Sequence, residues 1–348
     1  SQDLNYTLAH KKVYMGKALT RGLGAGMNPE IGKQAAEENR SEIGELLDGA
    51  DVVFVTAGMG GGTGTGASPV IADIAREKGI LTVGIVTKPF SFEGTQRLNI
   101  AQEGLMRLKE KVDSLIIIPN DRIFSVTNKD TSIAKAFGYV DEILKNAVQG
   151  IAELINTPGI INVDFADISS VMKDAGTTLI GIGVSGGENR GAKAVENAIN
   201  SPLLDSSIEG ARGVLFSIAG GKDMRMSEVN EIAKTIASHV DQSAKIIFGA
   251  YYDRKVKEKN IKVTVIATGF NNSYSAAPRY EVPNLFEKGN KSDFLEELYK
   301  EKKRTDDIPE KREPPAIKEK TKKMEIKNET EDSWDIPAFL RKNKKEKK

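Results

Sequence analysis

The chain has 348 residues, with 50 Lys and Arg against 49 Asp and Glu, and its formal net charge of +1 gives no overall field that would favour nucleic acid. It has no cysteine, which excludes disulfides, thiolate zinc sites and cysteine nucleophiles, and its two histidines argue against a histidine metal centre or a Ser-His-Asp triad. No run approaches the roughly 20 apolar residues of a membrane span and no signal peptide leads the chain, so we expect a cytoplasmic protein without direct membrane insertion.

The first fifty residues contain a glycine-spaced segment at 20–29, followed by a helix predicted over 29–47. Pro29 suits a first helical turn, and Glu30 suits the positive end of the helix. Such a junction could offer backbone amides to an anion, although an ordinary turn is the commoner explanation of the pattern.

Six glycines occur within residues 58–66, a stretch called here the glycine segment. The apolar run 51–56 before it predicts a buried parallel strand, and 67–78 after it has helical apolar spacing. Strand, glycine loop and helix form a phosphate cradle, because glycine allows close backbone approach and the helix N-terminus adds partial positive charge. A flexible surface loop is the alternative, but such a loop is not normally placed between a buried strand and a helix.

The strand–helix alternation continues and predicts a doubly wound parallel sheet. We expect strands at 80–87 and 114–118 and a helix at 100–111 between them. The polar loops 88–94 and 119–122 leave the carboxyl ends of these strands, where such sheets bind ligands. These loops should therefore converge on the glycine segment.

A long amphipathic helix is predicted over 131–155, about 35 Å long and able to connect two domains. After it, Asn162, Asp164 and Asp167 lie in an otherwise apolar stretch, where capping of a helix and catalysis explain the two aspartates equally well. Further alternation predicts a smaller α/β unit with a mixed sheet. Its expected strands are 178–184, 213–219, 244–252 and 262–269, with helices at 191–198 and 227–240.

From residue 271 the composition changes to Lys, Glu and Pro, which predicts a disordered linker. Residues 333–341 again include apolar and aromatic residues that favour order, among them the only Trp of the chain. Such a composition is expected of a short peptide that folds when it binds a partner. The basic residues 342–348 have a solubilising end as their default explanation, and contact with anionic lipid is the alternative.

Two common nucleotide motifs fit poorly. A Walker A loop needs Lys after its last glycine, and here Ala67 follows Gly66. Residues 62–67 do fit the dinucleotide pattern G-x-G-x-x-A, but that pattern expects an acid at the end of the next strand, where the chain has Thr87 and Lys88. A Rossmann-type oxidoreductase therefore remains only a distant alternative.

Five loops in order resemble the tubulin and FtsZ superfamily, in its FtsZ branch. They are the glycine segment and the loops 22–26, 88–94, 119–122 and 162–167, and residues 335–341 resemble the FtsZ tail peptide. The resemblance covers residues 1 to about 270 and the last dozen or so. It implies a GTP-binding domain at 1–130, a central helix at 131–156, a second domain at 157–270, a disordered linker at 271–331 and an adaptor-binding peptide with a basic tail at 332–348.

The resemblance also implies roles for individual residues. Phosphates would be held by Gly58, Gly60, Gly61, Gly62, Thr63, Gly64, Thr65 and Gly66, with Ala25, Gly26 and Asn28 near the γ-phosphate. Glu93 and Arg97 would lie by the ribose and phosphates, Phe137 would stack on the base, and Asn120 and Asp141 would bind the guanine edge. Asn162, Asp164 and Asp167 would enter the pocket of the next subunit, where the two aspartates would act on the attacking water and Asn162 would contact the nucleotide.

The implied function is a bacterial GTPase that polymerises head to tail into the cytokinetic ring at mid-cell, with GTP or GDP bound and Mg²⁺ held mainly through the phosphates. No protein metal site and no nucleic-acid partner are expected. Membrane-anchored adaptors such as FtsA would bind Trp334, Asp335, Ile336, Pro337, Phe339, Leu340 and Arg341. A tubulin-like filament for plasmid partition or cell shape, and a scaffold that binds GTP without turnover, are the alternatives.

The sequence resembles FtsZ from just after the family's Asn-Thr-Asp strand end. We therefore expect the family's first strand and first phosphate loop to be lacking in residues 1–348. On that expectation, this chain by itself would bind GTP poorly and would fold with difficulty.

Overall fold

The computed structural model describes residues 4–270, apart from residues 5 and 23 and the segments 126–130, 202–206, 254–255 and 257–258. All described residues belong to one unit, Ser1–Pro278. The predicted linker and adaptor-binding peptide lie outside the described residues. Within the described part, no helix is long and apolar enough to cross a bilayer.

The N-terminal part contains the helices α2 (Lys17–Thr20), α3 (Pro29–Glu38) and α4 (Arg40–Leu47). The prediction of one helix over 29–47 is wrong in this respect, because Asn39 leaves helical geometry at φ −108° and ψ 19°. The Asn39 side chain accepts from the amide of Gly16 at 3.4 Å and donates to Glu42 at 3.1 Å. These side-chain bonds stabilise the break and begin a second helix.

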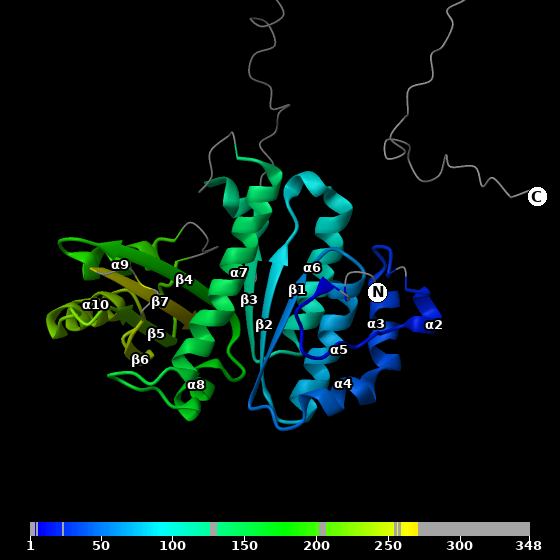
Figure 1. Ribbon diagram of the computed structural model, residues 1–348, viewed down its shortest axis with the longest axis horizontal. Coiled ribbons are helices and arrows are strands. Elements are labelled where there is room, and N and C mark those ends of the chain that lie inside the picture. Colours follow the sequence, from blue (N-terminus) through cyan, green and yellow to red (C-terminus); the bar gives the residue numbers. More distant parts are fainter. Residues whose placement is uncertain are drawn as a thin grey trace, which may run out of the picture. The chain divides into compact units, whose positions relative to one another are not determined.

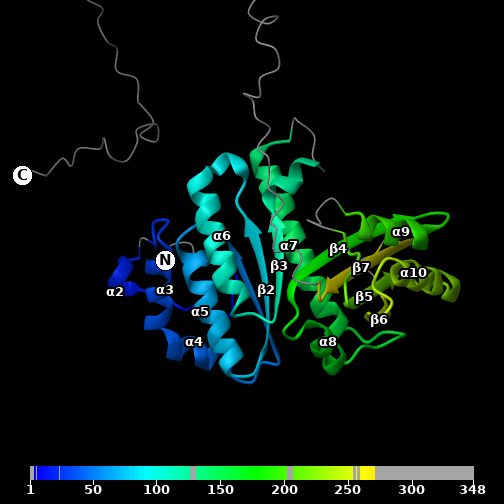
Figure 2. The same cartoon turned by 180° about the vertical axis from the view of Figure 1, so that it is seen from behind.

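Three parallel strands follow, β1 (Val52–Gly58), β2 (Leu81–Lys88) and β3 (Ser114–Pro119), as predicted. Helices α5 (Thr63–Glu77) and α6 (Thr95–Lys109) cover one face of the sheet, and α7 (Ile133–Asn156) lies against the other (Figures 1 and 2). Strand β2 shows why: Val83 and Ile85 pack with Ala147 and Ile151 of α7, whereas Val86 packs with α5 and α6. Alternate residues of a strand point to opposite faces, so an apolar strand needs both layers.

Two short 3₁₀ helices, η1 (Ser91–Glu93) and η2 (Asn120–Ser125), form at the carboxyl ends of β2 and β3. They occupy the two polar loops that were expected to converge on the glycine segment. Helix α5 also differs from its prediction, since it begins at Thr63 and not at Ala67. The last residues of the glycine segment are therefore the first turn of a helix.

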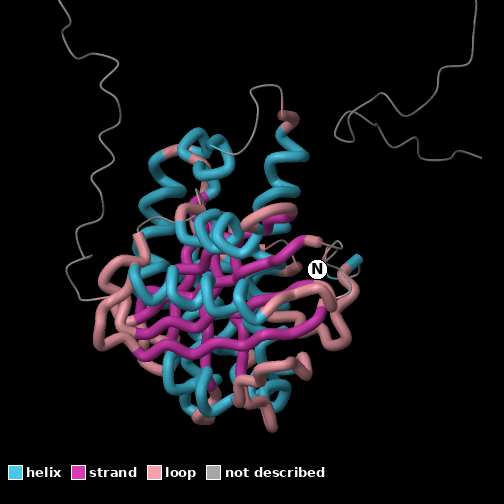
Figure 3. The backbone as a smooth tube through the Cα atoms, turned by 90° about the vertical axis from the view of Figure 1, so that its left-hand side faces the viewer, coloured by secondary structure: helices cyan, strands magenta, loops and turns pink. Residues whose placement is uncertain are grey.

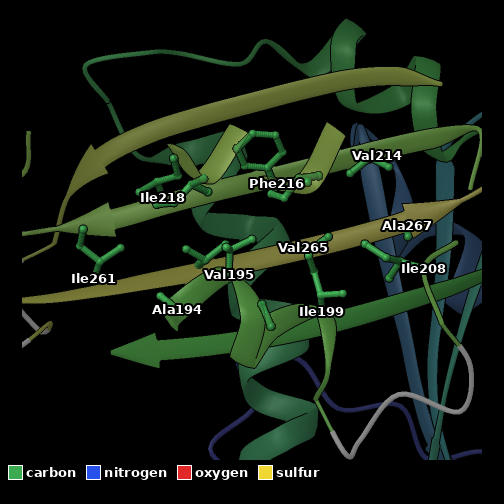
Figure 4. Close-up of a cluster of buried hydrophobic side chains, with 14 of the residues drawn as sticks. Ala194, Val195, Ile199, Ile208, Val214, Phe216, Ile218, Ile261, Val265 and Ala267 are labelled. Carbon is green, nitrogen blue, oxygen red and sulfur yellow. The ribbon is translucent and has the colours of Figure 1, made fainter. Parts of the chain in front are cut away.

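The second half comprises α8 (Phe165–Met172), β4 (Gly176–Gly186), α9 (Arg190–Ile199), β5 (Gly213–Gly220), α10 (Met226–Ser238), β6 (Lys245–Tyr252) and β7 (Asn260–Thr268). Its sheet is mixed, as predicted: β7 runs antiparallel to β4 and β5, and β5 is parallel to β6. Figure 3 views these strands from the side of α9 and α10. Figure 4 shows their core, in which side chains of α9 meet Phe216 and Val265.

Strand β4 belongs to both halves. Its residues 176–178 pair in parallel with 114–116 of β3, and residues 179–186 pair antiparallel with β7. The seven described strands consequently form one hydrogen-bonded sheet in the order β1-β2-β3-β4-β7-β5-β6. This shared strand joins the two halves through backbone hydrogen bonds, beside the long helix α7.

Candidate functional site

The glycine segment brings the first turns of α3 and α5 together. A Cβ atom on Gly66 would collide with the carbonyl oxygen of Pro29, and one on Gly32 would collide with that of Gly62. The two helix backbones therefore touch where both helices begin. First-turn amides have no partner inside a helix and carry partial positive charge, so two such turns side by side favour an anion.

The loop before α3 closes against this junction. The amide of Asn28 donates to the carbonyl of Ala25 at 2.9 Å, and the Asn28 side chain caps α3 by accepting from Glu30 at 3.0 Å. A Cβ atom on Gly62 would lie 2.7 Å from the Cβ of Ala25. The structure thus places the residues predicted near the γ-phosphate, Ala25, Gly26 and Asn28, beside the glycine segment.

The glycines of this segment differ in what requires them. Gly60 has a φ of +95°, and a Cβ atom there would lie 2.8 Å from the carbonyl oxygen of Arg97. At Gly61, in contrast, a Cβ atom would meet no heavy atom within 4 Å. Packing alone accounts for Gly60, Gly62 and Gly66, whereas the space beside Gly61 is open to a ligand.

A backbone amide and a side-chain hydroxyl of the glycine segment form a hydrogen bond with each other. The amide of Gly60 donates to the Thr65 hydroxyl at 2.9 Å, and Thr65 is buried. In this structure both groups stabilise the turn between β1 and α5. The amides that begin α5, from Gly61 to Gly64, are the ones placed to meet a phosphate.

The loop after β2 forms a second wall. Glu93 accepts from the amide of Phe90 at 2.9 Å and pairs with Arg97, at the start of α6. A side chain added at Gly60 would clash with the Pro89 ring and the Arg97 backbone, so this loop and the glycine segment are in contact. The expected convergence on the glycine segment is confirmed for the loop after β2.

The loops after β2 and β3 are tied to each other. The Ser91 amide donates to the Asp121 carboxylate at 2.9 Å, and the Ser91 hydroxyl bonds the same carboxylate. Phe90 is fully buried with Ile123 and Val140 beneath this pair. These contacts hold η1, η2 and the first turns of α7 as one wall.

Three residues predicted to bind a base lie on this wall. Asn120 is buried, and its Oδ1 atom has no hydrogen-bond partner among the described residues. Phe137 is 41% exposed and stands edge-on to Phe90, with ring centroids 5.2 Å apart at 82°. Asp141 is exposed one turn further along α7.

This wall suits a heterocycle with N–H donors. A buried carbonyl oxygen without a donor costs about 1–3 kcal/mol, which a ligand N–H at Asn120 would offset. The exposed face of Phe137 can stack on a planar ring, and the carboxylate of Asp141 can accept from ring N–H and amine groups. A purine base that carries such donors fits these residues.

Asn162, Asp164 and Asp167 lie in a different place. They belong to residues 159–167, called here the acidic loop, which leads into α8. Asp164 caps α8 by accepting from the amide of Asp167 at 2.7 Å, and Asn162 accepts from Gly159 at 2.7 Å. Capping, one of the two interpretations that the sequence left open, is thus present.

The acidic loop and the glycine segment lie at opposite ends of the strands. Phe165, at the beginning of α8, lines a cavity together with Asp51 and Leu81 at the beginnings of β1 and β2, whereas the glycine segment begins at the last residue of β1. Figure 1 shows α8 at the bottom and the arrowhead of β2 at the top. Seven residues of β1 at about 3.3 Å each separate the two by roughly 20 Å. One copy cannot bring them together.

Two structural residues of the site have no role in the sequence interpretation. Gly32 allows the backbones of α3 and α5 to come into contact, and its only signal in the sequence is that it is a glycine inside a predicted helix. Phe90 lies at the centre of an aromatic cluster with Phe92, Phe124 and Phe137, with centroid distances of 4.9 to 5.5 Å. Its position in a polar loop gave no sign of complete burial.

Comparison with known proteins gives matches over both halves. Residues 1–128 match the family described as Tubulin/FtsZ family, GTPase domain, and residues 176–271 match FtsZ family, C-terminal domain. An empty FtsZ dimer from M. jannaschii is 46% identical with a TM-score of 0.74, over 77% of this chain and 78% of that one. A tryptophan-to-tyrosine mutant of that FtsZ is 47% identical, with a TM-score of 0.74, over 77% and 80%.

A more distant structure shares the fold alone. CetZ2 from Haloferax volcanii, a protofilament bound to GTPγS, is 19% identical with a TM-score of 0.65, over 78% of this chain and 82% of that one. The fold is therefore also found in a protein of quite different sequence.

Proposed function

The chain belongs to the tubulin/FtsZ family, and from this premise we propose that it is a GTPase that assembles head to tail and hydrolyses GTP between successive copies. The family's GTPase domain supports the activity and the binding of GTP and GDP. Polymerisation as the trigger of hydrolysis is our inference from the geometry of the site.

The separation of the acidic loop from the glycine segment carries this proposal. The two lie at opposite ends of the strands, about 20 Å apart. If copies stack along the strand direction, the acidic loop of one copy faces the glycine segment of the next. A contact between two different faces repeats without closing, so it produces a filament. Assembly would then complete the site.

Within the shared site, phosphoryl transfer needs positioning and charge stabilisation more than covalent chemistry. The amides at the start of α5 and the Ala25–Asn28 loop would hold the phosphates, and Mg²⁺ would bind mainly through phosphate oxygens. Glu93 and Arg97 would lie by the ribose. From the neighbouring copy, Asp164 and Asp167 would orient and polarise the attacking water, and Asn162 would contact the nucleotide.

Asp164 can both cap α8 and act on water, because its bond to the Asp167 amide uses only Oδ1. Asp167 is half-buried in the first turn of α8, where its backbone is helical. Both carboxylates are therefore held by the start of a helix and not by a loose loop. Such fixed placement is what orientation of a water molecule requires.

The choice of guanine rests on Asn120, Asp141 and Phe137. The carboxylate of Asp141 can accept from both the ring N–H and the exocyclic amine of guanine, a pair that adenine does not offer at one edge. Asn120 has a buried Oδ1 atom that lacks a donor among the described residues. We infer a preference for GTP over ATP.

The cellular role that we propose is the cytokinetic ring of bacterial division, in the cytoplasm at mid-cell. The peptide from Trp334 to Arg341 would bind membrane-anchored adaptors such as FtsA, and it lies outside the described residues. A filament for plasmid partition or cell shape would share the fold and the enzyme chemistry. Localisation of the tagged protein in dividing cells separates these roles.

Sedimentation and phosphate release test the biochemical proposal together. With GTP and Mg²⁺, the full-length protein should pellet above a threshold concentration and release phosphate at a constant rate per pelleted copy. With ATP, neither should occur. Phosphate release that is proportional to total protein below the threshold would show a site complete in one copy, and pelleting without release would show a scaffold that does not turn over GTP.

A further inference from the structure

Three consecutive residues of β6, Gly249, Ala250 and Tyr251, contact both the end of α7 and the start of the acidic loop. They are called here the β6 seat. The helix α7 carries Phe137 and Asp141 near its beginning, and the acidic loop follows its end. Whatever fixes the end of α7 and the loop together therefore fixes the loop relative to the residues of the same copy that are proposed to bind the base.

Ala250 holds the loop through backbone hydrogen bonds. The amides of Ile160 and Ile161 donate to the carbonyl of Ala250 at 2.7 and 3.1 Å, and the amide of Ala250 donates to Ile161 at 3.0 Å. Gly159 must be glycine for this approach, because a Cβ atom there would lie 2.5 Å from the same carbonyl oxygen. The residue that follows this short ladder is Asn162.

Gly249 allows the two segments to converge. A Cβ atom on Gly249 would lie 3.2 Å from Leu154 of α7 and 3.2 Å from Val163 of the acidic loop. Both of these side chains are buried. The smallest residue of β6 thus lies where the end of the helix and the loop pack against the strand.

Tyr251 binds the helix itself. Its hydroxyl donates to Oε2 of Glu153 at 2.8 Å, across 98 residues of sequence. Glu153 also accepts from Gln149 at 2.5 Å, and Lys262 of β7 lies 3.6 Å from the same carboxylate. Burial and the neighbouring Glu153 raise the pKa of Tyr251 far above its ordinary value, so its hydroxyl stays protonated and donates.

Strand β6 is firmly placed under these contacts. It pairs with β5 along its whole length, and Phe248 stacks on Phe216 with ring centroids 5.1 Å apart. Tyr251 is only 4% exposed. A rigid strand can transmit position, and a misplacement of about 1 Å at a reacting group can cost about 100-fold in rate.

We propose that Tyr251 is a positioning residue for GTP hydrolysis, which acts through Glu153 and Ala250 to hold the end of α7 and the acidic loop in one fixed arrangement. This inference rests on the proposed function for its catalytic consequence. The placement of the loop by Tyr251 is a separate, structural claim that can be measured without any turnover.

Tyr251→Phe is the sharpest test, because it removes one hydroxyl and keeps the ring. Glu153 retains Gln149 and Lys262, so the variant should fold. Tyr252→Phe is the matched control, since that neighbouring tyrosine is 49% exposed and its side chain points to the other face of the strand. Tyr251→Phe should reduce kcat per pelleted copy by about 5- to 50-fold with KM for GTP unchanged. The control should match the wild type.

Amide hydrogen exchange in the unassembled protein gives the second readout. In Tyr251→Phe the amides of Ile160, Ile161 and Asp167 should exchange faster than in the wild type, while those of β5 stay unchanged. Gly159→Ala should change exchange and kcat in the same directions, since its Cβ atom displaces the loop without touching the tyrosine.

The outcomes separate the two proposals. Unchanged exchange and unchanged kcat in Tyr251→Phe would overturn the inference. If Asp167→Ala also leaves turnover unchanged, the proposed role of the acidic loop fails as well; if Asp167→Ala abolishes turnover, only the positioning role fails. Faster exchange in Tyr251→Phe with wild-type kcat would show a structural bond without influence on the reaction, and would likewise overturn the inference.

Discussion

A mixture of two inactive variants tests whether the site is shared between copies. Asp167→Ala removes a carboxylate of the acidic loop and leaves the glycine segment whole. Gly61→Asp places a negative charge where phosphate is proposed to bind and leaves the acidic loop whole. A side chain at Gly61 starts into open space, so both variants should fold.

The expected magnitudes follow from the separation of the two parts by roughly 20 Å. Alone, each variant should lose about 100-fold or more in phosphate release, the range for a positioned acid or base. In a random one-to-one filament, half of the interfaces have a whole glycine segment, and half of those meet a whole acidic loop. Turnover should therefore return to about one quarter of the wild-type value.

Phosphate release at constant total protein, well above the assembly threshold, is the assay. Two distinguishable tags establish by sedimentation that both variants enter the same pellet. If both are present and the rate does not exceed the mean of the two separate variants, each copy uses its own acidic loop, and the reasoning from strand geometry is refuted.

Three other predictions address packing, electrostatics and the tail. Gly66→Ala should lower the unfolding free energy by about 3 kcal/mol or more, because its Cβ atom would collide with Pro29, whereas Gly61→Ala should change it by less than about 0.5 kcal/mol. Urea denaturation followed by circular dichroism measures both values, and equal losses in the two variants would contradict the packing account. The hydrogen bond from Arg190 lowers the pKa of Glu228, so this ion pair contributes its full stability above the ordinary carboxyl pKa of about 4.3 and is lost as pH falls through the lower folded-state pKa. Glu228→Gln should therefore flatten the decline of stability below about pH 4.3, and an unchanged slope would argue against this role. Replacement of Trp334 and Phe339 by Ala should leave GTP-dependent pelleting intact and remove co-sedimentation with an FtsA-type adaptor, and retained co-sedimentation would place adaptor binding elsewhere in the chain.

Local signals were enough to predict most elements. Each strand of the sheet lies within two residues of its predicted bounds, because continuous apolar runs flanked by glycine and polar residues have few other uses. The glycine segment, the acidic loop and the order of the polar loops were also visible in the sequence. They pointed to the family that the comparisons show.

Contacts between distant residues could not be predicted in this way. The start of α5 at Thr63 and the break at Asn39 depend on which backbones meet, since Gly62 lies against Ala25 and the Asn39 side chain reaches Gly16. Strand β4 joins the two halves because its first residues find β3 and its later ones find β7. Periodicity carries no information on such partners.

The sequence by itself determined the fold class, the position of the glycine segment between a strand and a helix, and the presence of two aspartates at a helix start. Only the tertiary structure decided that those aspartates and the glycine segment lie at opposite ends of the strands, roughly 20 Å apart, and that Tyr251 of β6 is hydrogen-bonded to Glu153 of α7, 98 residues away in the sequence. The reason is physical. Helices and strands arise from neighbours along the chain, whereas a site depends on close packing between segments that only the folded chain brings together.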